Sequence, residues 1–141
     1  MVDLPPYPYV PGKNVRHPED WFDEIKSSVT GDLRPEDLDE TAAWKAGRAY
    51  FDAGFFWECH EVLEAVWMQT PQGTPEREMA QALIQLANAR LKLRMDKPRA
   101  VLRLCDMVAA HLEKCPQDRP VLGLWASEIT AWTVATRSTN G

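Results

Sequence analysis

The sequence predicts an all-α protein, a compact antiparallel bundle of five to six helices with an extended, proline-rich N-terminal arm. Three observations support this fold class. Hydrophobic residues make up 45% of the 141 residues, which is enough to bury one core. No segment alternates apolar and polar residues as a half-buried strand does. Proline, glycine and capping residues divide the chain into helix-length segments joined by short connections, so we expect one domain.

The first 17 residues differ in composition from the rest of the chain. They contain four prolines, which exclude a helix because proline lacks the N–H group and restricts the residue before it. We therefore expect residues 1–17 to form an extended arm on the surface, residues 18–136 to form a single helical domain, and residues 137–141 to form a frayed tail.

Start and stop signals place the helices. Pro18, Pro35 and Pro75 each suit the first position of a helix, Thr74 is a natural N-cap, and Gly54 suits a C-terminal cap. The expected helices cover about residues 18–29, 35–52, 55–69, 75–95, 97–114 and 120–136.

Composition narrows the class of protein. The net charge of −5 and the lack of a basic run argue against nucleic acid as a partner. No run of 18 apolar residues is present, so we expect no membrane span, and residues 1–11 do not resemble a signal peptide. The odd number of cysteines shows no metal-ligand spacing. We expect a cytoplasmic protein; a homodimer and an unidentified small-molecule ligand both remain open.

The segment 55–69 carries the most function-like residues. It is apolar nearly all round, and its ionisable side chains are Glu58, His60, Glu61 and Glu64. At about 100° per residue, His60 falls within the apolar stripe with Glu64 one turn further on, while Glu61 lies on the flank and Glu58 on the far side. A buried carboxylate needs a compensating partner, and two arrangements would supply one: internal pairing with Arg90 or Arg94 of helix 75–95, or a pocket lined by Glu, His, Gln and Trp side chains.

Two kinds of function fit this helix. The first is a structural polar network or the wall of a ligand pocket, without catalysis. The second is a metal-binding or hydrolase-like enzyme with His60, Glu61 and Glu64 as candidate catalytic residues. In that case His60 and Glu64, four residues apart, would bind a divalent metal, as the outer residues of a zinc-protease motif do. His111 is a remote candidate for a further ligand.

A longer pattern resembles a known prokaryotic family. The run Glu58-Cys59-His60-Glu61-Val62-Leu63-Glu64-Ala65-Val66-Trp67 is similar to the signature Glu-x-His-Glu-x-x-Glu-x-x-Trp of domain of unknown function 309. Two later blocks, at residues 83–87 and 97–100, also resemble this family, so the likeness covers about residues 43–114. The resemblance implies a compact helical fold, assigns no activity, and marks Glu58, Trp67 and Gln85 as candidate binding positions beside His60, Glu61 and Glu64. Lys92 stands where many members have histidine.

Overall fold

A computed structural model describes residues 2–140. Within that range it contains six α-helices and one 3₁₀ helix and no β-strand, which confirms the predicted all-α class. The elements are α1 (Asp23–Lys26), the 3₁₀ helix η1 (Pro35–Glu40), α2 (Ala42–Ala53), α3 (Phe56–Met68), α4 (Pro75–Arg94), α5 (Pro98–Glu113) and α6 (Ala126–Thr139).

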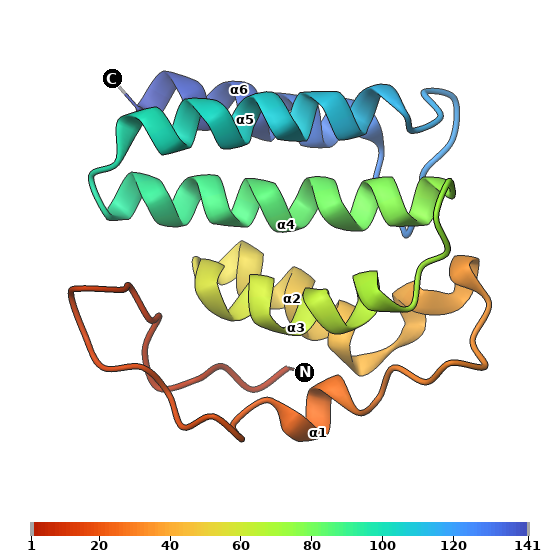
Figure 1. Cartoon of the computed structure of the whole chain (residues 1–141), viewed down its shortest axis with the longest axis horizontal. Helices are drawn as coiled ribbons and strands as arrows, with labels where there is room; N and C mark the ends of the chain where they lie inside the picture. The colour runs from red at the N-terminus through yellow and green to blue at the C-terminus, as the bar shows by residue number, and fades with distance from the viewer. Residues whose placement is uncertain (1, 141) are drawn as a thin grey trace.

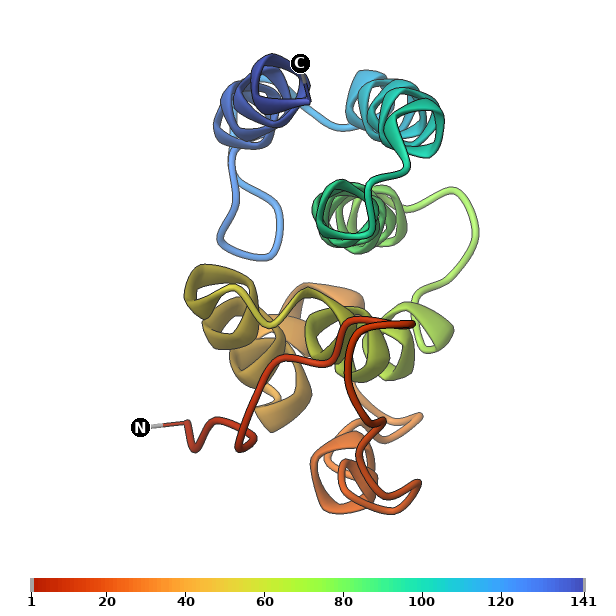
Figure 2. The same cartoon turned by 90° about the vertical axis from the view of Figure 1, so that its left-hand side faces the viewer.

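The long helix α4 occupies the centre of the bundle. It packs against α5 and α6 on one side and against α3 on the other, and α2 pairs with α3 (Figure 1). The arm and α1 lie beneath the α2–α3 pair, on the side away from α5 and α6 (Figures 1 and 2). The core between these layers is formed by large side chains without solvent exposure, among them Leu38, Leu63, Met79, Leu83, Leu86 and Ile129.

The expected caps of α2 and α4 are present. Gly54 follows α2 with a φ of 84°, a left-handed conformation that glycine adopts without steric cost. The Thr74 hydroxyl accepts a hydrogen bond from the backbone N–H of Arg77, and Pro75 occupies the first helical position.

Three expected helices differ from the structure. Only Asp23–Lys26 of the segment 18–29 is α-helical, because residues 18–22 form successive turns that bury Phe22. The segment 35–52 breaks at Thr41, whose hydroxyl accepts from the Trp44 N–H while its own backbone is extended.

The last helix begins later and ends later than expected. Residues 121–124 form a tight turn in which Leu122 and Gly123 both have positive φ, and reciprocal backbone hydrogen bonds join Val121 to Leu124. α6 therefore starts at Ala126 and continues to Thr139, so residues 137–139 are helical rather than frayed; Gly141 lies outside the described residues.

Candidate functional site

Three ligand-type side chains gather on the outer face of α3. One ligand atom from each of His60, Glu61 and Glu64 lies within 4.8 Å of the other two. Nε2 of His60 is 3.3 Å from Oε2 of Glu64, one helical turn further on, and Nδ1 of His60 is 4.0 Å from Oε2 of Glu61. These are the three candidate catalytic residues from the sequence, and they share one patch.

The burial of this helix differs from the expectation. The side chain of His60 is 27% exposed and that of Glu64 53%, whereas Glu58 is completely buried. The buried arc of α3 is centred on Cys59, Val62 and Val66, not on the stripe through Phe56 and Trp67 that the projection favoured. At 100° per residue, this centre turns Glu58 inward and His60 outward.

A lysine from α1 completes the surface patch. Nζ of Lys26 donates a hydrogen bond of 2.9 Å to Oε1 of Glu61, and both side chains are partly buried. This contact uses one oxygen of the carboxylate and leaves Oε2 on the side of His60. Lys26 therefore orients Glu61 and offsets part of the negative charge that two neighbouring carboxylates place around one imidazole.

Glu58 forms a separate, enclosed site with the arm. Its Oε2 accepts two hydrogen bonds of 2.7 Å, one from the backbone N–H of Tyr9 and one with Nε2 of His17. The other oxygen, Oε1, has no hydrogen-bond partner within residues 2–140. Glu58 therefore belongs to a structural polar network, as the sequence suggested, but its partner is a histidine that the sequence analysis did not single out.

Aromatic rings enclose the His17 imidazole. The rings of Tyr7, Trp21, Phe22 and Trp57 have centroids 4.9 to 6.3 Å from it. Rings from the arm, from the turn before α1 and from α3 thus keep water away from the bond between His17 and Glu58. A polar or charged group that is shielded from water in this way is costly unless it is hydrogen-bonded, so His17 and Glu58 each depend on the other as a partner.

The two arginines considered as partners of the α3 carboxylates have other roles. Arg90 donates to the Thr136 hydroxyl at 3.1 Å and lies over the Phe51 ring, and Arg94 donates to the Gly54 carbonyl and lies over the Phe56 ring. Burial lowers the pKa of both guanidinium groups. These arginines therefore join α4 to α6 and to the end of α2, and of the two alternatives the internal Arg–Glu pairing is not formed by Arg90 or Arg94.

Trp67 and Gln85 take part in local contacts. The guanidinium of Arg77 lies 4.1 Å from the centroid of the Trp67 ring, which ties the end of α3 to the start of α4. Oε1 of Gln85 accepts a hydrogen bond of 3.2 Å from Asn88 in the same helix. The two side chains form no hydrogen bond with each other or with Glu58, so no shared binding site for these three positions is evident.

Cys59 and His111 are the other side chains near in sequence or type that could act with His60, and neither does so. Cys59, next to His60 in sequence, is completely buried, and burial raises the pKa of its thiol, so it does not supply a reactive thiolate. His111 lies on α5, where its Nδ1 is 3.2 Å from Oε1 of Glu78 on α4. It does not join the His60 cluster.

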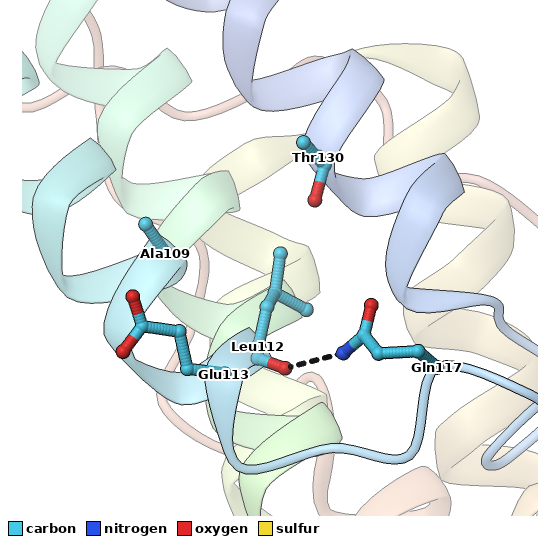
Figure 3. Close-up of a pocket in the computed structure, with 5 residues that line it drawn as sticks. All are labelled: Ala109, Leu112, Glu113, Gln117 and Thr130. Carbon is cyan, nitrogen blue, oxygen red and sulfur yellow. Dashed lines mark hydrogen bonds between the residues drawn. The ribbon is translucent and has the colours of Figure 1, made fainter.

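A hollow of about 450 Å³ lies between α5 and α6 (Figure 3). Its walls include Leu112, Glu113, Gln117 and Thr130, and the Gln117 amide donates to the Leu112 carbonyl at 3.2 Å. The Thr130 hydroxyl donates to a backbone carbonyl of its own helix. Because these polar groups already bond within the protein and Glu113 has no acid–base partner among the lining residues, the hollow does not form a catalytic set.

Comparison with known families agrees with the motif on α3. Residues 44–104 match the family model described as Domain of unknown function (DUF309). This segment runs from α2 into α5 and includes the His60 cluster and Glu58, whereas the arm and α6 lie outside it. The match is to the same family that the motif resembles, and its description supplies no activity to transfer. Neither curated proteins nor solved structures give a match.

Proposed function

We propose that the protein binds a divalent transition-metal ion on the surface of α3 through His60, Glu61 and Glu64. The observation that carries this proposal is the gathering of three ligand atoms from these residues within 4.8 Å of one another. One imidazole nitrogen with two carboxylate oxygens is a donor set that suits Zn²⁺ and neighbouring ions of the first transition row.

The geometry fits a three-ligand site. Metal–ligand bonds of about 2.0–2.2 Å place ligand atoms a little over 3 Å apart, so the separation of 3.3 Å between His60 Nε2 and Glu64 Oε2 already matches. Glu61 Oε2 lies beside the other ring nitrogen, Nδ1, so it must move towards Nε2 to share an ion with Glu64, while Oε1 stays with Lys26. Glu58 is excluded as a fourth ligand because it is buried with His17.

The partial exposure of the three ligands determines the coordination and the affinity expected of the proposed metal site. Three protein ligands on a surface helix leave the remaining coordination positions to water, the pattern of an open site rather than a closed structural one. The positive charge of Lys26 opposes the ion, and Glu64, 53% exposed, must lose side-chain freedom on binding, so we expect micromolar rather than nanomolar affinity. The hydrolase-like alternative lacks a specific supporting observation.

The direct test is a titration of the metal-free, untagged protein with Zn²⁺ against a chromophoric chelator. We expect one ion per chain, loss of that ion in His60→Ala, and retention in His111→Ala. His111 is the matched control because it also pairs with a carboxylate and has a similar exposure, 24% against 27%. Equal affinity in the two variants, or no stoichiometric Zn²⁺, would contradict the proposal.

The net charge and the cysteines bear on the partners and the cellular compartment of the protein. The net charge of −5 argues against a phosphate-backbone partner. Cys59, Cys105 and Cys115 are buried and form no disulfide, which supports a reducing compartment such as the cytoplasm. No helix within residues 2–140 combines the length and apolar character needed to cross a membrane. Prokaryotic origin and a homodimer stay predictions.

A further inference from the structure

A second hollow, of about 580 Å³, lies on the side of the bundle covered by the start of the arm. Its walls come from residues 2–4, from Trp21 and α1, and from the exposed edge of α2. It shares no lining residue with the His60 cluster or with the hollow in Figure 3. Its volume falls within the usual range for small-molecule sites, about 300–1,000 Å³.

Charged groups of both signs line this hollow without internal partners. Asp3 and Glu24 contribute carboxylates and Lys45 contributes an ammonium group. None of the three forms an ion pair or a side-chain hydrogen bond with any other residue of the described range 2–140. All three side chains are exposed to solvent, as are Asp20 and Asp23 near α1, whereas Lys26 is held by Glu61. These three charges are therefore free to meet a ligand.

Tyr50 adds a polar group at the base of the hollow. The residue is only 1% exposed, and its hydroxyl has no hydrogen-bond partner among residues 2–140. Burial, with the nearby charges of Glu58 and Asp3, raises the pKa of this hydroxyl to about 12, so it stays protonated and can donate. An acceptor that a ligand brings to this hydroxyl would gain a hydrogen bond.

The remaining walls are apolar and partly uncovered. Leu4 is 48% exposed and Trp21 45%, although both are large hydrophobic residues, and Ile25 and Ala46 line the same hollow. An apolar group that covers them would gain about 25 cal/mol for each Å² removed from water.

We propose that this hollow binds a small zwitterion with a bulky apolar side chain, such as a free aromatic or branched-chain amino acid. Its ammonium group pairs with the carboxylates of Asp3 and Glu24. Its carboxylate pairs with Lys45 and accepts the Tyr50 hydroxyl, and its side chain covers Trp21 and Leu4.

A ligand with one charge suits the same walls less well. An anion without an ammonium group would approach two carboxylates, and a cation without a carboxylate would leave Lys45 and the Tyr50 donor without partners. A zwitterion satisfies both signs at once. This complementarity selects the ligand class. Each mismatched charge loses an ion pair and leaves a charged group that is desolvated without a partner.

The test is an NMR titration of the full ¹⁵N-labelled chain with three matched probes: L-phenylalanine, phenethylamine and 3-phenylpropanoate. We expect L-phenylalanine to shift the backbone amides of Lys45 and Ala46 with a Kd on the order of 1 mM. The two probes with a single charge should bind about threefold or more weakly, since partly exposed charge pairs contribute below about 1 kcal/mol each. Unmoved amides at about 10 mM L-phenylalanine, or equal binding of all three probes, would overturn the proposal.

Two variants separate the ligand contacts from general effects. Tyr50→Phe removes the hydroxyl and keeps the buried ring, so it should weaken L-phenylalanine binding about threefold at an unchanged melting temperature. Lys45→Met should remove the advantage of L-phenylalanine over phenethylamine, while Lys92→Met, a lysine outside the hollow, should leave it intact. Unchanged binding in both Tyr50→Phe and Lys45→Met would also overturn the proposal.

Discussion

Nε2 of His17 lies 2.7 Å from Oε2 of Glu58, and both side chains are buried although 41 residues separate them in the sequence. The same oxygen accepts the Tyr9 N–H. These are the only hydrogen bonds that join residues 2–17 to the helices within the described chain, since the other arm bonds, such as Tyr7 to Val15, are internal. One buried carboxylate oxygen therefore accepts both of these hydrogen bonds, beside the packing of Val10 in the core and an exposed ion pair of 3.5 Å between Lys13 and Asp96.

Replacement of Glu58 by alanine should release the arm. The change leaves a buried imidazole and a buried N–H without their acceptor, and breaking a buried pair in this way costs about 3 kcal/mol of unfolding free energy. Chemical denaturation measures this loss. Glu64→Ala on the exposed side of the same helix is the control and should stay within about 0.5 kcal/mol. Trypsin should also cleave after Lys13 and Arg16 faster in Glu58→Ala. Equal stability of the two variants would contradict the anchoring role.

Close packing of α2 on α3 depends on Gly47. A Cβ at this position would lie 2.3 Å from Cδ2 and 2.6 Å from Cγ of Leu63, which is fully buried in the core. Gly47→Ala should therefore cost about 1–3 kcal/mol, although alanine is the better helix former.

A double-mutant cycle isolates this contact. In a Leu63→Ala background the added methyl group at position 47 meets no side chain, so its cost should largely disappear. Additive losses in the double variant would show that the close approach of Gly47 to Leu63 is not the cause.

Alkaline pH should weaken the fold through Tyr50. Its pKa is about 12 in the folded protein against about 10 for a tyrosine in an unfolded chain. Between these values the folded state keeps a proton that the unfolded state releases, so stability present below about pH 10 is lost as the pH rises towards 12. The loss reaches about 1 kcal/mol near pH 11. Tyr50→Phe should lack this component when denaturation is compared across that pH range, and a parallel decline in both proteins would contradict it.

Lys26 should tune the proposed metal site. Lys26→Met removes a positive charge that bonds to Glu61, so Zn²⁺ affinity should rise about two- to tenfold at low ionic strength, and added salt should reduce the difference. The measurement is the same chelator competition, with Lys92→Met as the control. A weaker site in Lys26→Met would mean that orientation of Glu61 outweighs charge.

Local sequence signals predicted the helix boundaries that are marked by strong caps. Gly54 and the pair Thr74–Pro75 are strong signals, and both place a helix boundary within a residue or two. The prediction failed where tertiary burial overrides local preference. Residues 18–22 form turns rather than a helix because Phe22 is buried in the core. The tight turn at 121–124 needs Leu122 in a left-handed conformation, which a leucine in the sequence does not predict.

The candidate site was predicted in part for a related reason. The spacing of His60 and Glu64 on a helix is a local property, so their proximity followed from periodicity. Which face is buried depends on where α4 and the arm pack, and an apolar helix does not reveal this from its own residues. The partner of Glu58 was missed because His17 lies in a proline-rich segment without periodicity. Its position among aromatic residues, between Tyr7 and Trp21, was the available signal.

The most direct test of the metal site follows the ring nitrogens of the three histidines by NMR while Zn²⁺ is added to the metal-free protein. The account predicts that one ring nitrogen of His60 shifts and saturates at one equivalent, that His17 stays fixed with Glu58, and that His111 stays fixed with Glu78. Unchanged His60 resonances, or shifts at His111 in place of His60, would contradict a metal site formed by His60, Glu61 and Glu64.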